Sequence, residues 1–311
     1  AQAHAADGKS ETFTDAEKAG VDYTLQGEYA GQLKGENGDE KWGAQVIALG
    51  GGKFHAIGYK GGLPGDGWKR EDEKHESDGE LKDGAVVFKK EDQLATLKDG
   101  AISVKVGDKE LGTLKKVERK SPTLGAKPPE GALVLFDGSN VDQWNNGQMT
   151  EDKLLKATNV ETKEKFNDHT LHIEFRTPFM PVARGQGRGN SGVYMQSRYE
   201  LQVLDSFGLD GADNECGGIY SINKPLVNAC LPPLAWQTYD IEFKAAKYDA
   251  AGKKTENGRA TIKHNGIVIH DNLELKHGTP GRHNEGPTPD AIFLQDHGNP
   301  VVYRNIWIIK Q

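Results

Sequence analysis

The chain has 311 residues, a charged fraction of 27% and a formal net charge of −7 at pH 7. This length allows two domains of ordinary size. Because neither half of the chain is basic, nucleic acid is excluded as an expected partner. No stretch approaches the ~20 apolar residues that a membrane span needs. The 39 glycines indicate a chain with many turns.

The N-terminal part of the chain predicts a small domain of β hairpins. Residues 1–20 are small, polar and charged, which predicts a loose arm or a short helix. Residues 21–120 contain short alternating or apolar segments separated by Gly or Asp, as expected for the strands of a small accessory β domain. Residues 121–131 are rich in Pro and Gly and are the predicted linker.

Residues 132–311 also have the pattern of strands. The alternation in "LHIEFRT" and "WQTYDIEFKA" is typical of strands, and Asn265-Gly266 between two alternating runs predicts a tight hairpin. A capping residue ahead of helix formers predicts one helix over residues 151–158. Many short strands without a βαβ pattern predict an all-β chain, with a β-sandwich or jelly roll in this second part.

Two strand segments in the second part place polar side chains opposite an apolar face. In the first segment, His172, Glu174 and Arg176 alternate with apolar residues. The second segment carries a polar row of even-numbered side chains, namely Tyr194, Gln196, Arg198, Glu200 and Gln202, opposite Val193, Met195, Tyr199, Leu201 and Val203. An ordinary solvated face usually carries Lys, Glu and Thr, whereas these rows contain no Lys. If both rows belong to one curved sheet, they form one polar surface suited to sugar hydroxyls.

Predicted strand ends supply further polar groups. Asp205 follows the second segment, and Gln295, Asp296 and His297 lie in "LQDHGNP" at another strand end. The sequence contains no HExxH, CxxC pair, P-loop, Rossmann fingerprint or GxSxG. The usual metalloprotease, nucleotide-binding and serine-hydrolase motifs therefore give no support, and no organic cofactor is expected.

Seven segments follow one another in the order typical of one family: "LVLFDGSNVDQW", "LHIEFRTP", "GRGNSGVYMQSRYELQVLDSFG", "CGGIY", "NACLPPLAWQTYDIEF", "HNGIVIHDN" and "LQDHGNPVVYRNIW". Through them, about residues 132–310 resemble the 3-keto-disaccharide hydrolase family. The longer form, with a β domain in front, resembles proteins of planctomycete-type bacteria. The resemblance implies a concanavalin-like jelly roll and a carbohydrate substrate.

The resemblance also implies a reaction, since some family members act on glycosides already oxidised to a ketone at C3 of the sugar. A carbonyl at C3 acidifies the hydrogen on C2, so a base can remove it and the C1–oxygen bond is then expelled. Addition of water makes the net reaction a hydrolysis. This chemistry needs a base, an enolate stabiliser and a proton donor, and it does not need the two-carboxylate geometry of ordinary glycosidases.

This chemistry gives roles to residues in the two polar rows and beside them. The predicted base is Glu174 or Glu200, and His172 and His297 are candidates for proton transfer. The side chains predicted to stabilise the enolate or hold sugar hydroxyls are Arg176, Arg198, Gln202, Asn190, Tyr194, Gln196 and Gln295. Trp236 is a candidate for stacking on a sugar, although core packing is favoured for it.

Binding of a divalent metal ion is the alternative role for His172 and His297. Its predicted ligands are His172, Glu174, Glu200 and His297. Calcium is the second possibility, with oxygen ligands such as Asp205 and Asp296. Cys216 and Cys230 would pair as a disulfide in an oxidising compartment or remain two buried thiols in a reducing one.

Two other functions compete with the enzyme. A lectin-like carbohydrate-binding protein would use the same fold and the same polar face, although His172 beside Glu174 and Glu200 favours the enzyme. A structural protein of the cell envelope would use exposed strand edges of the N-terminal β domain. The start at Ala-Gln-Ala without an initiator Met suits a trimmed chain or an exported protein, periplasmic, in the cell envelope or extracellular. The oligomeric state does not follow from the sequence.

Overall fold

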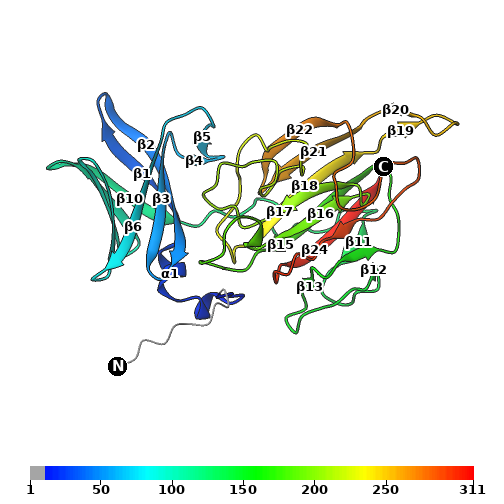
Figure 1. Cartoon of the computed structure of the whole chain (residues 1–311), viewed down its shortest axis with the longest axis horizontal. Coiled ribbons are helices and arrows are strands. Elements are labelled where there is room, and N and C mark those ends of the chain that lie inside the picture. The colour runs from blue at the N-terminus through cyan, green and yellow to red at the C-terminus, as the bar shows by residue number, and fades with distance from the viewer. Residues whose placement is uncertain (1–10) are drawn as a thin grey trace.

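The first eight long strands close into an antiparallel barrel (Figure 1). The computed structural model describes residues 11–311. Around the barrel, the strands are β1 (Gly27–Gly35), β10 (Lys109–Val117), β9 (Ala101–Val106), β8 (Gln93–Lys98), β7 (Ala85–Lys90), β6 (Lys74–Lys82), β3 (Lys53–Lys60) and β2 (Gly38–Gly50). Because β1 pairs with both β2 and β10, the barrel has no free edge. The exposed edges that the cell-envelope hypothesis required of this domain are therefore not found in the barrel.

Short elements precede and interrupt the barrel. The 3₁₀ turn η1 (Ala16–Lys18) and the helix α1 (Gly20–Leu25) come before β1, and β4 (Leu63–Pro64) and β5 (Gly67–Trp68) lie between β3 and β6. The described part of the predicted N-terminal arm thus holds η1 and the start of α1, and residues 1–10 lie outside the described residues. Within residues 11–311, no helix has the length and hydropathy needed to cross a bilayer.

The C-terminal part is a sandwich of two antiparallel sheets. The seven-stranded sheet contains β11 (Leu133–Phe136), β24 (Val302–Lys310), β15 (His169–Arg176), β18 (Gln237–Lys244), β21 (Gly258–His264) and β22 (Ile267–Leu275), with β13 (Leu155–Lys156) paired to β24. The five-stranded sheet contains β12 (Trp144–Asn145), β14 (Val160–Thr162), β23 (Phe293–Leu294), β16 (Ser191–Met195) and β17 (Tyr199–Val203). The 3₁₀ turn η2 (Gly185–Gly187) precedes β16, and β19 (Lys247–Tyr248) pairs with β20 (Lys254–Glu256).

Alternation of side chains builds the core between the two sheets. Leu171, Ile173 and Phe175 of β15 face Val193 and Leu201 of β16 and β17 within one buried cluster. All five are fully shielded from solvent, as expected when each sheet buries one face of every strand. The prediction of an all-β chain with a jelly-roll sandwich is confirmed.

Two local predictions in the sandwich had different outcomes. The hairpin at Asn265-Gly266 is confirmed, because both residues have positive φ and join β21 to β22. The helix predicted over residues 151–158 is wrong. Instead Leu155 pairs with Tyr303 of β24, and its side chain is fully buried in the sandwich core. Tertiary pairing here outweighs the weak helix propensity of the segment.

The barrel and the sandwich share apolar contacts. Phe179 of the sandwich exchanges two backbone hydrogen bonds of 2.9 Å with Phe13, and its ring is fully buried in the barrel core. Phe207 packs against Ile47 and Ile57 on the outer wall of the barrel. These rings tie the two parts together through the hydrophobic effect.

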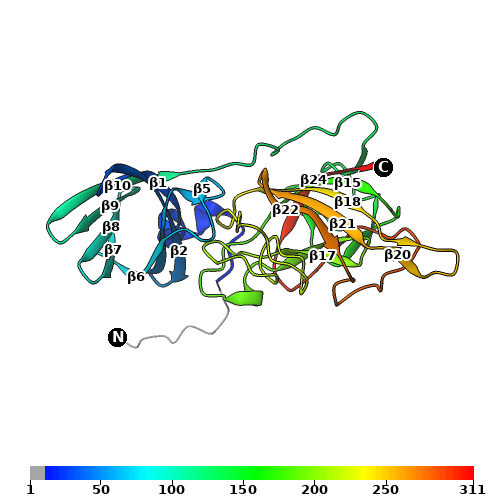
Figure 2. The same ribbon diagram turned by 90° about the horizontal axis from the view of Figure 1, so that it is seen from above.

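The linker is also fixed to the sandwich. Figure 2 shows the segment between β10 and β11 crossing over the outer face of the seven-stranded sheet. It contacts three strands in turn, with Thr123 donating to Asp240 of β18, the Gly125 amide to Glu174 of β15, and the Ala126 carbonyl accepting from Trp307 of β24. The linker is therefore an ordered cover on this sheet.

Candidate functional site

The two polar rows lie on different sheets. His172, Glu174 and Arg176 belong to β15 of the seven-stranded sheet, whereas Tyr194, Glu200 and Gln202 belong to β16 and β17 of the five-stranded sheet. The expected single polar surface is therefore wrong. The hydrophobic pattern fixed which face each row takes, but it carried no information on which strands are neighbours.

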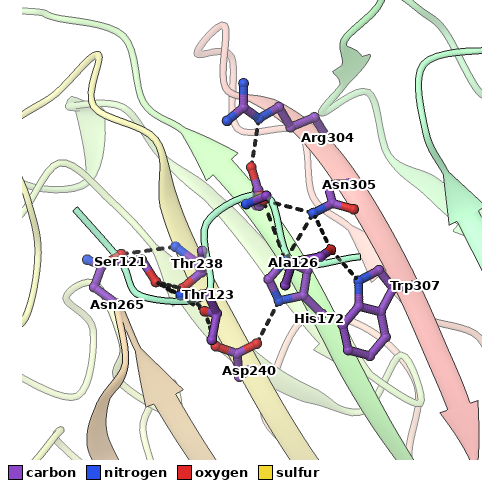
Figure 3. Close-up of polar contacts among 12 residues, drawn as sticks. Ser121, Thr123, Ala126, His172, Thr238, Asp240, Asn265, Arg304, Asn305 and Trp307 are labelled. Atoms are coloured by element: carbon purple, nitrogen blue, oxygen red, sulfur yellow. Dashed lines mark hydrogen bonds and ion pairs between the residues drawn. The ribbon is translucent and has the colours of Figure 1, made fainter. Parts of the chain in front are cut away.

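The linker covers the first row (Figure 3). His172 Nδ1 lies 2.6 Å from Asp240 Oδ1, and its ring stacks on Trp307 at 5.0 Å. The carboxylate of Glu174 accepts hydrogen bonds from the Gly125 amide at 2.5 Å and from Arg304 Nε at 2.7 Å. Both His172 and Glu174 are buried. This arrangement attaches the linker to the sheet.

The pKa shifts of Glu174 and His172 agree with a role of this row in anchoring the linker. Burial alone would raise the pKa of Glu174, but hydrogen bonds from His172, Asn305, Gly125 and Arg304 outweigh it and lower the pKa to about 2. Burial would lower the pKa of His172, and its contacts with Asp240 and Glu174 raise it instead. Glu174 is thus a stabilised carboxylate and a weak base.

We expect Glu174→Gln to lower the free energy of unfolding by about 1–3 kcal/mol at pH 7, because the amide loses charge-assisted hydrogen bonds. The depressed pKa gives Glu174 a contribution that is full above pH 4.5 and is lost as the pH falls towards 2. Urea denaturation at several pH values measures this. Glu242→Gln, on the exposed side of neighbouring β18, is the matched control and should change stability by less than about 0.5 kcal/mol. An equal loss in both variants would contradict the anchoring role.

Arg176 ends the first row in a stack of charged and aromatic groups. Its guanidinium lies 5.1 Å from the ring centre of Trp236, and that of Arg304 lies 3.9 Å from the same ring. Trp236 is therefore engaged by two cations and is not part of the sandwich core. The structure places this stack with the seven-stranded sheet, apart from the second polar row.

The second row is divided between two strands. The sequence indicated one strand, but a turn at residues 196–198 makes it a hairpin, and the predicted alternation holds only within β16 and β17. Val193, Leu201 and Val203 point into the core, and Tyr194, Glu200 and Gln202 are on the opposite face of β16 and β17. Gly192 stands beside Glu200 on this face, where an added Cβ would come within 2.6 Å of the Glu200 carboxylate. The absence of a side chain at Gly192 thus leaves room for the Glu200 carboxylate.

Glu200 is the carboxylate of this face, and both its burial and its pKa suit a functional role. Its side chain is only 4% exposed. Burial raises its pKa to about 7, and a hydrogen bond with the Tyr194 hydroxyl opposes the rise only partly. Burial and the charge of Glu200 in turn raise the pKa of Tyr194. A carboxyl group with a pKa near neutrality can exchange protons at physiological pH.

Amides surround this carboxylate. Gln295 Nε2 donates to the Tyr194 hydroxyl at 3.1 Å. On the other side, Gln186 Oε1 accepts from Gln202 at 3.2 Å and from Asn190 at 3.1 Å. Gln186 and Gln295 are half-buried, so the polar face reaches solvent at these two residues.

Several buried polar atoms beside Glu200 have no hydrogen-bond partner within the described chain. They are Asn190 Oδ1, Gln202 Oε1 and Gln295 Oε1. Buried polar atoms are nearly always paired, so a group of unpaired acceptors needs an explanation. Acceptors of this kind suit the hydroxyl groups of a sugar.

Two other predicted sugar-binding residues, Gln196 and Arg198, instead form hydrogen bonds that hold neighbouring loops in place. Gln196, in the tight β16–β17 turn with a φ of 50°, donates to the Phe166 carbonyl at 2.9 Å. Arg198 donates to Gln196 and to the Gly286 carbonyl. Both side chains are buried in these contacts. The structure therefore separates them from the face that carries Glu200.

The predicted metal ligands are dispersed. His172 and Glu174 lie on one sheet, Glu200 lies on the other, and His297 is exposed in the loop before β24. Asp205 pairs with Arg188 at 2.6 Å, and Asp296 is exposed and caps the Gly298 amide. Within residues 11–311, no three His, Cys, Asp or Glu side chains form a group that could hold a metal ion. Neither predicted ligand set is assembled.

The two cysteines are buried free thiols. The Cys216 sulfur lies 3.2 Å from the Tyr239 hydroxyl, and the Cys230 sulfur lies 3.4 Å from the Leu231 carbonyl oxygen. They form part of the core cluster between the sheets. The structure therefore places both thiols in the core, and their pairing in an oxidising compartment stays a prediction.

Sequence reasoning missed three residues around Glu200. Gln186 lies in a glycine-rich loop and joins Asn190 to Gln202. Thr279 donates to the Arg198 carbonyl and accepts from the Glu200 amide, which fixes the loop that follows β22. Arg282 lies 3.7 Å from the ring centre of Phe293, beside Tyr194. No strand pattern marks these loop residues, since their positions depend on the fold.

Known proteins match the sandwich. A family model described as "3-keto-alpha-glucoside-1,2-lyase-like domain" matches residues 131–309. A solved structure described as "a putative glycosyl hydrolase from Parabacteroides distasonis ATCC 8503" is 32% identical, with a TM-score of 0.54 over 59% of this chain and 85% of that chain. A second one with the same description is 17% identical, with a TM-score of 0.43 over 58% of this chain and 94% of that chain. Comparison with curated proteins found no match.

These matches define the C-terminal part as a carbohydrate-active β-sandwich of the glycosyl hydrolase type. The chain belongs to the family of 3-keto-alpha-glucoside-1,2-lyase-like domains. The resemblance found in the seven sequence segments is thereby confirmed. The matched residues begin after the barrel, so the family assignment concerns the sandwich.

Proposed function

We propose that the sandwich cleaves the glycosidic bond of 3-keto glycosides and that Glu200 is the base. The observation that carries the proposal is a buried carboxyl group with a pKa of about 7, among acceptors that lack partners. Membership of the lyase-like family supports the same substrate class. Glu174, the other candidate base, has a pKa of about 2 and lies beneath the linker.

In the proposed reaction, the Glu200 carboxylate removes the proton from C2 of the sugar. The C2–H electrons form an enolate with the C3 carbonyl, and collapse of the enolate expels the electron pair of the C1–oxygen bond. The leaving oxygen takes up a proton. Water then adds to C1 while C2 regains a proton, so the net change is hydrolysis.

The neighbours of Glu200 suit the other requirements of this reaction. A phenol hydroxyl and amide N–H groups are hydrogen-bond donors that stabilise an enolate oxygen in a site of low dielectric constant. Tyr194, Gln295 and Gln202 supply such donors around Glu200. The unpaired oxygens of Asn190 and Gln202 accept from sugar hydroxyls.

Substrate comparison tests this function. We expect the wild-type protein to release 3-keto sugar from a 3-keto glycoside and to leave the unoxidised parent glycoside intact, because only the ketone acidifies C2. Product chromatography measures both reactions. Equal cleavage of the two substrates would indicate an ordinary glycosidase. Saturable binding of the sugar without cleavage of either substrate would indicate a lectin-like protein.

A further inference from the structure

The barrel encloses a cavity of about 430 Å³, which the proposed reaction does not use. Its lining includes the turn between β1 and β2 and the residues Lys90, Gln93 and Val106 at neighbouring strand ends. The mouth of the cavity is therefore at the end of the barrel that carries the β1–β2 turn. Figure 1 shows the β1–β2 hairpin pointing away from the sandwich. All the lining residues belong to the barrel strands and their connections.

The opposite half of the barrel is filled. Tyr29, Val46, Phe54 and Leu97 are buried there in one cluster with Phe179 of the sandwich. None of these five residues lines the cavity. The cavity thus has a packed floor and one open end.

Small side chains leave the half of the barrel nearest the mouth empty. The lining positions Ala44, Ala56, Gly58, Ser77 and Ala95 come from four different strands. An eight-stranded barrel is just wide enough either to be filled by large side chains or to hold one small ligand. Small residues at these inward positions produce the second case.

The remaining wall is apolar and contains two large aromatic rings. Trp42 and Phe88 line the cavity together with Leu33, Ile102 and Leu114. The Trp42 ring lies 5.5 Å from that of His75 at an angle of 48°. Apolar walls with aromatic rings favour a ligand that contains a ring.

Charges of both signs surround the mouth. Glu40 pairs with Lys60 at 3.1 Å, and Glu73 Oε1 lies 2.7 Å from His75 Nε2. The lining carries three lysines and four glutamates, so little net charge remains to attract an ionic ligand. The rim therefore suits a neutral molecule.

We propose that the barrel binds a small, neutral, ring-containing apolar molecule at a site separate from Glu200. The volume lies within the range of pockets that enclose small organic ligands. The closed barrel, its packed floor and its layer of small side chains make a preformed pocket, so binding needs no rearrangement of the strands.

Titration with N-phenyl-1-naphthylamine, a neutral apolar fluorescent probe, tests this site on the full chain. We expect a saturable rise in fluorescence with one probe per chain. Ala56→Leu and, separately, Ala95→Leu should weaken binding at least 10-fold by filling the pocket. Ala85→Leu is the matched control, because Ala85 precedes the inward-facing Val86 and faces outward. It should bind the probe as the wild type does.

The two proposed sites give separable results. Glu200→Gln should bind the probe normally, and Ala56→Leu should retain turnover of a 3-keto glycoside, so failure of one proposal leaves the other intact. Circular dichroism checks that each variant is folded. Absence of saturable binding to the wild type would overturn the barrel site. Unchanged affinity in folded Ala56→Leu and Ala95→Leu would do the same.

Discussion

Glu200→Gln should lower kcat on a 3-keto glycoside by about 10²–10⁴-fold, which is the usual contribution of a general base. The amide has nearly the shape of the carboxyl group and cannot take the C2 proton. For the wild type, kcat/KM should rise with pH through about 7 and level off above it, since only the ionised Glu200 is the base. Steady-state rates across pH 5–9, about two units either side of that pKa, measure both effects.

The same substitution should stabilise the fold above pH 7. In the folded state Glu200 holds its proton up to a pH of about 7, whereas the unfolded chain loses it near 4.5. Stability therefore falls as the pH rises between these values, by about 3 kcal/mol in total. Glutamine carries no charge and avoids this loss. A variant that gains stability while losing activity is typical of a strained functional site.

Glu174→Gln is the matched control for activity, because it makes the same change in the other candidate base. It should keep kcat within a few-fold of the wild type while losing stability. Loss of turnover in Glu174→Gln, with normal turnover in Glu200→Gln, would move the base to the seven-stranded sheet and contradict the proposed site.

Phe179→Ala should destabilise the fold by about 3–5 kcal/mol, as deletion of a fully buried phenylalanine does. Its ring belongs to the sandwich segment but lies in the barrel core at 0% exposure. The variant therefore removes packing from the barrel and loosens its contact with the sandwich. Urea denaturation followed by circular dichroism measures the loss.

Val182→Ala is the control for Phe179, since it lies three residues further on the same segment and is 47% exposed. It should change the free energy of unfolding by less than about 0.5 kcal/mol. A loss below about 1 kcal/mol in Phe179→Ala would mean that the barrel core does not depend on the sandwich.

The alternation of side chains was sufficient to predict the two faces of β16 and of β17, but it indicated one continuous strand where the structure has a hairpin with its turn at residues 196–198. Val193 and Leu201 are core residues, and Glu200 stands on the other face, as expected. The Asn265-Gly266 turn was predictable because its backbone needs two residues that tolerate positive φ. The family resemblance depended on ordered segments that surround these elements.

Long-range pairing was not predictable from a local pattern. Nothing in the alternation of β15 shows that His172 and Glu174 lie on the opposite sheet from Glu200. The Pro- and Gly-rich linker has the composition of a flexible segment, but the Gly125 amide and the Ala126 carbonyl fix it to the sheet. Closure of the barrel likewise depends on the pairing of β1 with β10, whose register runs from Glu28 opposite Val117 to Leu33 opposite Gly112, far apart in the sequence.

Deuterium incorporation tests the role of Glu200 most directly. Turnover of a 3-keto glycoside in D₂O, followed by mass spectrometry of the released sugar, reports whether C2 has exchanged its proton with solvent. The proposed mechanism predicts one deuterium at C2 with the wild type, and incorporation no faster than in the enzyme-free control with Glu200→Gln. Released sugar with no excess deuterium over that control would contradict proton removal from C2.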